Sequence, residues 1–241
     1  VDDVSIDVGI FTNLTRDHLD FHKTMENYYL AKKKLFYKTK INNIINVDDS
    51  YGKRLYEELI NDNVPAISYA IENEADIKAS NLVTTMIGTS FDLKINGNTK
   101  KMHVNTPGKF SVLNSLGALG AAYALGVNVD NIIEALSVIK GVKGRFEIIK
   151  NNLDCTIILD FAHTADGLET INEFAQGRKT VLYGAGGERD ISRRAPMGEV
   201  AAKYECISIL TSDNPRFEDP YDICMEIAKG VLKYKGDYKI I

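Results

Sequence analysis

The sequence predicts an α/β protein built from two domains that meet near residues 144–150. Three observations lead to this prediction. The chain has 241 residues, 44% of them hydrophobic, which is enough to bury two modest cores. From residue 146 onward, short β-branched runs alternate with helical runs in the order typical of parallel β-α-β units. Between residues 66 and 104, β-type runs alternate instead with turn residues, which indicates hairpins.

The elements of the first part follow from apolar runs and helix caps. Residues 4–11 (VSIDVGIF) are apolar and β-branched, so we expect a buried strand there. Thr24 is a typical N-cap, and it begins a helix that ends near Lys32-Lys33-Lys34. The other expected elements are a strand at 41–47, a helix at 51–61, an Asn96-Gly97-Asn98 hairpin turn within 66–104, helices at 111–125 and 131–139, and a hinge at 141–144.

The second part repeats strand, loop and helix. Its expected strands are at 155–160, 180–183 and 207–211, and its expected helices are at 166–174, from 198, and at 221–233. A polar cluster follows each strand, at residues 160–163, 184–190 and 212–216. Because ligands gather at the carboxyl ends of parallel strands, we expect a binding site at this edge.

Both ends of the chain lie within predicted strands. The sequence begins without an initiator Met, and residues 238–241 (YKII) are typical of a strand that is just beginning. A domain rarely starts and stops in this way. We therefore expect the chain to be a piece of a longer protein.

Composition excludes several classes of protein. The formal net charge of −4 argues against a nucleic-acid scaffold, which usually carries a basic excess. No apolar run approaches the roughly 20 residues of a membrane helix, and the sequence starts without a secretory pattern. Cys155, Cys206 and Cys224 are too few and too scattered for a disulfide framework or a zinc cluster. We expect a monomeric cytoplasmic enzyme or binding protein, with neither nucleic acid nor membrane as a partner.

Two clusters in the first part are candidates for chemistry. The loop at 13–20 (NLTRDHLD) combines His18 with carboxylates, a common way to hold a divalent metal near phosphates, although an Asx-type turn explains the spacing equally well. Lys32 lies on the helix face shared with Tyr28 and Phe36. A basic run at a helix end is usually a solvated face. An inward lysine, however, is costly unless its pKa falls or it is modified, which singles out Lys32.

Two later segments suit ligand binding. In residues 106–114 (TPGKFSVLN), Asn114 offers the paired donor and acceptor that match a base edge, although the segment is also an ordinary helix start. The loop 184–190 (GAGGERD) brings backbone N–H groups toward an anion, and Arg189 adds positive charge. A tight turn with exposed arginines accounts for this loop as well.

The last cluster is Asp213-Asn214-Pro215-Arg216. Pro215 stiffens the loop and holds Asn214 extended. Arg216 can then present a bidentate fork to a carboxylate. A capped loop with a surface arginine has the same spacing, so both interpretations stay open at this point.

Taken together, these strings resemble the Mur ligase family, whose members build the peptide stem of bacterial cell-wall precursors. The matching segments follow that family's order: NLTRDHLDFH (13–22), the helix at 25–32, PGKFSVLN (107–114), GRFE (144–147), DFAHTAD (160–166), GAGGERD (184–190) and DNPR (213–216). They span nearly the whole chain. Within the family, DNPR resembles the string of the members that add meso-diaminopimelate, whereas lysine-adding relatives lack the arginine.

The resemblance implies a fold and a pair of domains. It predicts an incomplete central ATPase-type domain, a mixed sheet with helices, over residues 1–146. A partial Rossmann-like C-terminal domain that binds the amino acid is implied over residues 147–241. The family's UDP-sugar domain, its Gly-Lys-Thr P-loop and a glutamate metal ligand are expected upstream, and the end of the acceptor pocket downstream. We therefore expect this chain alone to be inactive and to bind Mg·ATP weakly.

The resemblance also implies a reaction. ATP phosphorylates the D-glutamate carboxylate of UDP-N-acetylmuramoyl-L-alanyl-D-glutamate, and the amine of meso-diaminopimelate attacks the acyl phosphate to form an amide. Phosphoryl transfer between anions needs a metal ion and cations to offset negative charge. By the resemblance, His18 binds Mg²⁺, and Lys32 is carbamylated, which turns it into an anion that holds the metal.

The same resemblance assigns binding residues. The expected ATP contacts are Asn114, Arg145, Asp160 and His163. The expected diaminopimelate contacts are Arg189, Asp213, Asn214, Pro215 and Arg216. Phe161 and Ala165 stand where the family usually has Tyr and Pro, which leaves room for altered acceptor choice.

Three alternatives stay open. The chain could belong to a Mur-like ligase for L-lysine or to a folylpolyglutamate-synthase-like ligase. Arg216 argues against both, because it suits a second carboxylate on the acceptor. A degenerate ligase that serves as a binding scaffold is the third alternative, and the intact clusters argue against it.

Overall fold

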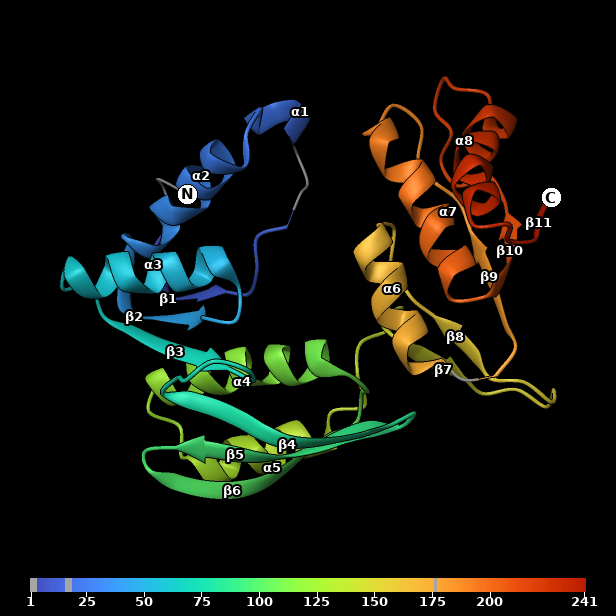
Figure 1. Cartoon of the computed structure of the whole chain (residues 1–241). Helices are drawn as coiled ribbons and strands as arrows, with labels where there is room; N and C mark the ends of the chain where they lie inside the picture. The colour runs from blue at the N-terminus through green and yellow to red at the C-terminus, as the bar shows by residue number, and fades with distance from the viewer. Residues whose placement is uncertain (1–3, 16–18, 176) are drawn as a thin grey trace. The chain divides into compact units, whose positions relative to one another are not determined.

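The computed structural model describes residues 4–15, 19–175 and 177–241, which form two units (Figure 1). The units are Val1–Lys140 and Gly141–Ile241. Each has its own sheet and its own apolar core, so the expected α/β class is confirmed. None of the helices among the described residues combines the length and the apolar character needed to cross a membrane.

A mixed six-stranded sheet organises the first unit. Its strands are β1 (Ile6–Phe11), β2 (Thr39–Asn46), β3 (Ala66–Ala70), β4 (Ile77–Thr85), β5 (Gly88–Ile95) and β6 (Asn98–Val104), in that spatial order. Strands β1 to β4 pair in parallel, and β4, β5 and β6 pair antiparallel. Asn96 and Gly97 both have positive φ, as a two-residue type I′ turn requires, which confirms the predicted hairpin.

Helices cover both faces of this sheet. They are α1 (Leu19–His22), α2 (Met25–Phe36), α3 (Ser50–Asn61), α4 (Lys109–Ala124) and α5 (Val129–Val138). Successive residues of a strand point to opposite faces. Ile44 accordingly packs with Leu116 of α4, while its neighbour Ile45 packs with Leu55 of α3. At Gly120 a Cβ would lie 2.6 Å from Ile44 Cγ2, so this glycine allows α4 to approach β2 closely.

Two expectations for the first unit need correction. The first strand is only half-buried, because β1 pairs with β2 alone among the described residues and so lies at an edge. Helix α4 begins at Lys109, two residues earlier than expected, with Gly108 as its N-cap. Asn114 therefore lies in the second turn of α4 and not in the first.

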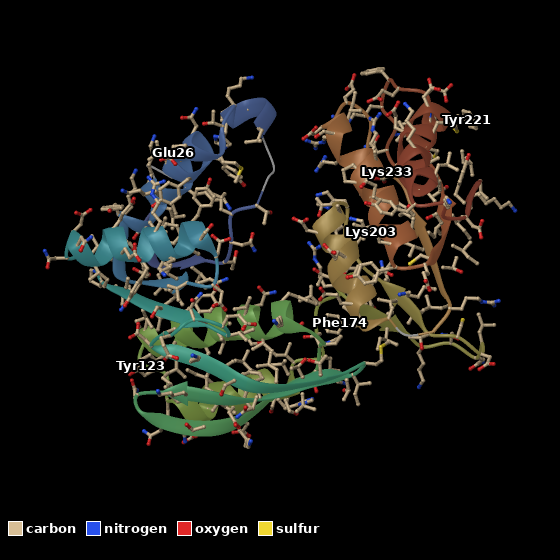
Figure 2. The ribbon with its side chains drawn as sticks, viewed as in Figure 1. Glu26, Tyr123, Phe174, Lys203, Tyr221 and Lys233 are labelled. Carbon is tan, nitrogen blue, oxygen red and sulfur yellow. The ribbon has the colours of Figure 1, made fainter. Side chains whose placement is uncertain are left out.

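The second unit has a small parallel sheet. Its elements are β7 (Glu147–Ile149), β8 (Ile157–Leu159), α6 (Ala165–Phe174), β9 (Lys179–Tyr183), a 3₁₀ turn (Ile191–Arg193), α7 (Arg194–Lys203), β10 (Cys206–Leu210), α8 (Pro220–Lys233) and β11 (Tyr238–Ile240). The parallel sheet has the order β11-β10-β9. Contrary to the expected run of parallel units, β8 pairs antiparallel with β7, because the short connection between them permits no crossover. Phe174 at the end of α6 packs edge-to-face on Phe146, just before β7 (Figure 2).

Candidate functional site

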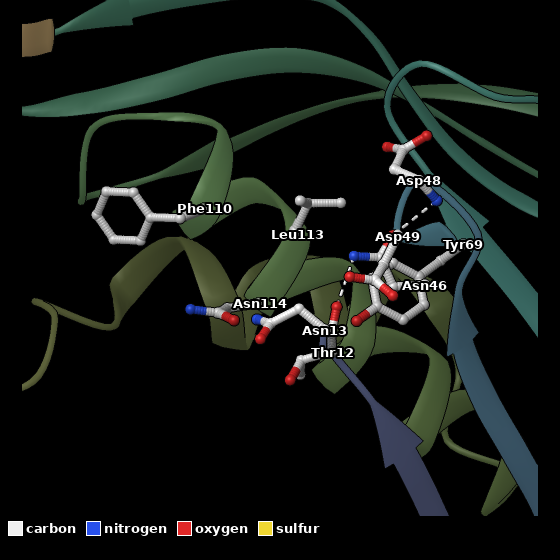
Figure 3. A pocket seen from close by; sticks show the side chains of 9 residues that line it. All are labelled: Thr12, Asn13, Asn46, Asp48, Asp49, Tyr69, Phe110, Leu113 and Asn114. Carbon is white, nitrogen blue, oxygen red and sulfur yellow. Dashed lines mark hydrogen bonds between the residues drawn. The ribbon is translucent and has the colours of Figure 1, made fainter. Parts of the chain in front are cut away.

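A cavity of about 260 Å³ opens in the first unit at the carboxyl ends of β1 and β2 (Figure 3). Its lining residues are Thr12 and Asn13 after β1, Asn46, Asp48 and Asp49 at or after the end of β2, Tyr69 in β3, and Phe110, Leu113 and Asn114 in α4. Ligands of parallel α/β sheets gather at this edge. The cavity is therefore the candidate site of the first unit.

The groups that line the cavity suit a nucleotide base better than they suit phosphates. Asn13 and Asn114 each carry a carboxamide that donates and accepts, as a base edge requires, and Phe110 adds an aromatic surface. Asp48 and Asp49 add negative charge, which repels phosphate groups. Whole small-molecule sites usually measure about 300–1,000 Å³. This cavity therefore fits part of a nucleotide, such as its base.

The two carboxylates of the cavity bind backbone N–H groups. Asp48 accepts hydrogen bonds of 2.6–3.2 Å from the N–H groups of residues 71–73, and so holds the turn after β3. Asp49 Oδ1 caps α3 by accepting from the N–H groups of Tyr51 and Gly52, at 2.9 and 3.0 Å. The two carboxylates therefore hold the turn after β3 and the start of α3, which lie beside the cavity.

The described residues do not by themselves fit Mg²⁺. Among them, no three His, Cys, Asp or Glu side chains gather into a group that could hold a metal. His18 lies outside the described residues. Lys32 in its ordinary ammonium form is a donor and not a ligand. The assignment of Mg²⁺ to His18 and a carbamylated Lys32 stays a prediction.

Helix α2 is fixed to α3 by a polar network centred on Glu58. This carboxylate accepts from Tyr29 Oη at 2.7 Å and Arg54 Nε at 2.9 Å, and pairs with Lys33 Nζ at 2.7 Å. Burial alone would raise the pKa of Glu58, but the hydrogen bonds from these three groups outweigh it and lower the pKa to about 2. Glu26, which lies near the start of α2 (Figure 2), also pairs with Arg54 at 2.8 Å. The network therefore sets which face of α2 turns toward α3.

Of the three successive lysines, Lys32 reaches toward the cavity loop. Its Nζ lies 3.5 Å from Asn13 O, at the outer limit of a hydrogen bond, and 5.0 Å from the ring centroid of Tyr28. Lys33 turns instead to Glu58, and Lys34 is exposed. Lys32 is half-buried, whereas a fully inward side chain was expected. Its carbamylation stays a prediction.

In the second unit, three of the predicted ATP contacts lie together. Arg145 Cζ lies 4.5 Å from the ring centroid of Phe161, and His163 Nδ1 is 3.2 Å from Phe161 O. Asp160 accepts from the backbone N–H groups of Phe146 at 2.6 Å and Ala162 at 2.7 Å. Asp160 thus ties the Arg145 segment to the loop after β8. Asn114, the fourth predicted contact, belongs to the first unit, and all four stay predictions as ATP contacts.

The predicted diaminopimelate loops also lie together. Residues 184–190 follow β9 and residues 212–216 follow β10, which are neighbouring parallel strands. The Gly187 N–H donates to Asn214 O at 2.8 Å. Arg216 has φ of +54°, a left-handed conformation that costs energy for a residue with a side chain, and its side chain is exposed. Arg189 is exposed as well, so both guanidinium groups are available to a ligand.

An ion pair between a buried arginine and a half-buried glutamate joins these two loops. Arg194, at the start of α7, makes two 2.8 Å hydrogen bonds to the carboxylate of Glu218, and its side chain is 4% exposed. Glu218 also accepts from the Glu188 N–H at 2.5 Å. The bonds from Arg194 and from the Glu188 N–H lower the pKa of Glu218 to about 2. The pair links the loop after β9 to the loop after β10.

The sequence motifs missed several of these residues. In the first unit they are Asn46, Asp49 and Tyr69, and in the second it is Glu218. Asn13 and Phe110 lie within the segments 13–20 and 106–114 that the sequence singled out. The Asn46-Val47-Asp48-Asp49 string, polar at the end of a predicted strand, is the signal that could have located the first group. Nothing in the spacing of Arg194 and Glu218 indicates their pairing.

Two family models match the chain. The Mur ligase middle domain matches residues 1–122, and the Mur ligase, glutamate ligase domain matches residues 144–240. Among curated relatives, the UDP-N-acetylmuramoyl-L-alanyl-D-glutamate--2,6-diaminopimelate ligase of Alkaliphilus oremlandii is 44% identical over 245 residues, which cover 100% of this chain and 50% of that protein.

Solved structures agree with these matches. A structure of UDP-N-acetylmuramoyl-L-alanyl-D-glutamate--2,6-diaminopimelate ligase has a TM-score of 0.64 at 28% identity, and the similarity covers 99% of this chain and 50% of that one. The MurF ligase of Thermotoga maritima in complex with ADP has a TM-score of 0.69 at 18% identity over 98% of this chain and 52% of that one, which shows the fold alone. The chain thus spans about half the length of the curated relatives that it matches.

Proposed function

The chain belongs to the Mur ligase family, and on this premise we propose that it forms part of an ATP-dependent amide ligase of peptidoglycan precursor synthesis. The proposed reaction adds meso-diaminopimelate to UDP-N-acetylmuramoyl-L-alanyl-D-glutamate through an acyl phosphate. Residues 1–146 are proposed as part of the central ATP-binding domain, and residues 147–241 as part of the domain that binds the amino acid. We place the protein in the cytoplasm as a monomer.

The observation that carries this proposal is the pair of loops at the ends of β9 and β10. They present two exposed guanidinium groups, those of Arg189 and Arg216. The hydrogen bonds between Arg194 and Glu218 hold the two loops together. Diaminopimelate carries two carboxylates, and a guanidinium fork binds a carboxylate through two hydrogen bonds. Lysine carries one carboxylate and so offers no partner for the second arginine.

Asn114 and Asn13 of the first unit are proposed as contacts of the nucleotide base. In the second unit, Arg145, Asp160 and His163 are proposed as ATP contacts, among which Arg145 supplies positive charge. His18 and a carbamate on Lys32 are proposed as the residues that would hold Mg²⁺, which would supply positive charge beside phosphate groups. The 44% identical relative named as a diaminopimelate ligase supports this choice of reaction.

Two other functions remain candidates. A ligase for another acceptor, such as L-lysine or a folylpolyglutamate-type substrate, would use the same phosphoryl chemistry. Phe161 and Ala165, which depart from the family pattern, favour this alternative. A scaffold that binds without catalysis would keep the fold and lose turnover.

The test is an ADP-release assay on the full-length protein that contains this chain. The assay supplies UDP-N-acetylmuramoyl-L-alanyl-D-glutamate, ATP and Mg²⁺, and compares meso-diaminopimelate with L-lysine. We expect a strong preference for diaminopimelate, which Arg216→Ala removes. Arg178→Ala, which deletes an exposed arginine just before β9, is the matched control and keeps the preference.

Each outcome selects one function. Preference for diaminopimelate that depends on Arg216 supports the proposal. Equal or faster turnover with L-lysine refutes the acceptor assignment and keeps the ligase. Release of no ADP with either acceptor refutes the ligase and favours the scaffold.

A further inference from the structure

The backbone of residues 11–14, which leads from β1 into the cavity, is held at four successive residues by side chains from four elements. Two of these bonds come from neighbouring strands. Tyr69 Oη in β3 donates to Phe11 O at 3.2 Å. Asn46 Nδ2 at the end of β2 donates to Thr12 O at 2.7 Å (Figure 3). Both donors therefore reach across the sheet to the segment.

The other two bonds come from helices. Lys32 Nζ in α2 donates to Asn13 O at 3.5 Å. Asp49 Oδ2, at the start of α3, accepts from the Leu14 N–H at 3.1 Å. We call the four side chains Tyr69, Asn46, Lys32 and Asp49 the 11–14 brace.

The brace is built to keep its geometry. Tyr69 is fully buried and Asn46 is 4% exposed. Burial, with the nearby charges of Asp49 and Asp48, raises the pKa of the Tyr69 phenol, so its hydroxyl keeps the proton that it donates. The Asp48 N–H donates to Asn46 Oδ1 at 3.0 Å, which fixes the orientation of the carboxamide and leaves Nδ2 for Thr12.

Phe11 is the last residue of β1, and residues 12–14 lie beyond it, where the strand ladder no longer holds the backbone. Side-chain hydrogen bonds take over that task at Thr12, Asn13 and Leu14. The side chain of Asn13 lines the cavity beside Asn114, and the backbone of residues 12–14 determines where it lies. We infer that Asn46 and Asp49 are positioning residues, which fix Asn13 against the cavity where the nucleotide base binds. This inference rests on the proposed function.

The two carboxylate oxygens of Asp49 have different partners, so a substitution can remove one interaction and keep the other. Its Oδ1 caps α3, and its Oδ2 holds Leu14. Asparagine caps a helix as well as aspartate does, but a carboxamide has a single acceptor oxygen. Asp49→Asn therefore keeps the cap and places an N–H donor against the Leu14 N–H. Asp219→Asn makes the same change at the cap of α8, where Asp219 accepts from the Tyr221 N–H, and serves as the control.

The test measures ADP affinity of the full-length protein by titration calorimetry with Mg²⁺ present. We expect Asp49→Asn to weaken ADP binding about tenfold, the effect of one hydrogen bond to a charged group. Asp219→Asn keeps the wild-type affinity. Both variants keep their caps, but Asp49→Asn also loses the Leu14 bond, so its melting temperature falls by about 2–4 °C, the effect of about 1 kcal/mol. Asn46→Asp is a second variant, in which a carboxylate oxygen replaces the N–H group that donates to Thr12 O. We expect it to lose the same amount of ADP affinity.

Three results would overturn the inference. They are wild-type ADP affinity in Asp49→Asn and Asn46→Asp, a loss of affinity that Asp219→Asn shares, and a loss that appears only where the variant is unfolded at the temperature of the titration. The test is separate from that of the proposed function. A full-length protein that binds ADP and forms no amide would refute the ligase, and the affinities of the variants would still decide the role of the brace.

Discussion

Gly187→Ala tests whether the contact between the two acceptor loops matters for function. A Cβ at Gly187 would lie 1.9 Å from Pro215 O and 2.6 Å from Pro215 C. Both atoms are backbone, so no side chain can turn away to make room. Nonbonded carbon contacts are favourable at about 3.5–4.0 Å. The loop after β9 must therefore move away from the loop after β10 by at least about 1 Å.

This displacement has an energy and a functional consequence. Overpacking of this kind costs about 1–3 kcal/mol of folding free energy. At this chain length, about 1 kcal/mol lowers the melting temperature by about 2–4 °C. A displacement of 1 Å in groups that position a substrate costs up to about a hundredfold in rate. We expect kcat/KM for meso-diaminopimelate to fall about ten- to hundredfold in the full-length protein.

Two other glycines provide matched controls. A Cβ at Gly186, in the same loop, would have its nearest neighbours at 3.7 Å, so Gly186→Ala keeps the melting temperature. A Cβ at Gly198 would lie 2.2 Å from Ile227 O, in the packing of α7 against α8, so Gly198→Ala lowers stability away from the loops. Steady-state assays over a range of diaminopimelate concentrations separate KM from kcat. The reasoning is refuted if Gly187→Ala keeps the wild-type KM for diaminopimelate, or if Gly198→Ala raises it equally.

Two further predictions follow from single side chains. In ¹³C-bicarbonate, the full-length protein should give a carbamate carbon signal by NMR, which Lys32→Ala removes and Lys33→Ala keeps; a signal that survives Lys32→Ala would contradict the assignment. Because the folded-state pKa of Glu58 is lowered from 4.5 to about 2, its stabilising effect is complete above about pH 4.5 and is lost as the pH falls toward 2. The stability difference between the wild type and Glu58→Gln, measured by urea unfolding, should therefore shrink over that range, and a difference that stays constant from pH 6 to 3 would contradict it.

The sequence was sufficient where a structural feature depends on residues that are close together in the chain. Asn96-Gly97 predicts its turn because both residues tolerate positive φ. The strand, loop and helix order of the second part predicts that the loops after β9 and β10 share an edge, and they do. Local spacing also predicts that Lys32 shares a helix face with Tyr28, and its Nζ lies 5.0 Å from the centroid of that ring, whereas the role of Lys32 stays a prediction.

Features that depend on distant residues were not predictable in this way. An apolar run indicates a strand, but it does not indicate which strand pairs with it. The antiparallel pairing of β7 with β8 was therefore not predictable. Helix α4 starts two residues before the expected range 111–125, because Gly108, with φ of +94°, ends the preceding loop there. The Arg194–Glu218 pair joins residues 24 apart, and each alone is typical of an exposed surface residue.

Both candidate sites show why such distant partners matter for function. A loop beyond the end of a strand has left the sheet's hydrogen-bond ladder, so side chains from other elements hold its backbone in place. Asp49 provides one for residues 11–14, and Glu218 provides one for residues 184–190. The motif residues present groups to a ligand, whereas the partners that hold the motif come from other elements. A substitution at a residue outside every motif can therefore impair binding as much as one within a motif, and a carboxylate that binds a loop's backbone N–H is where such an effect is expected first.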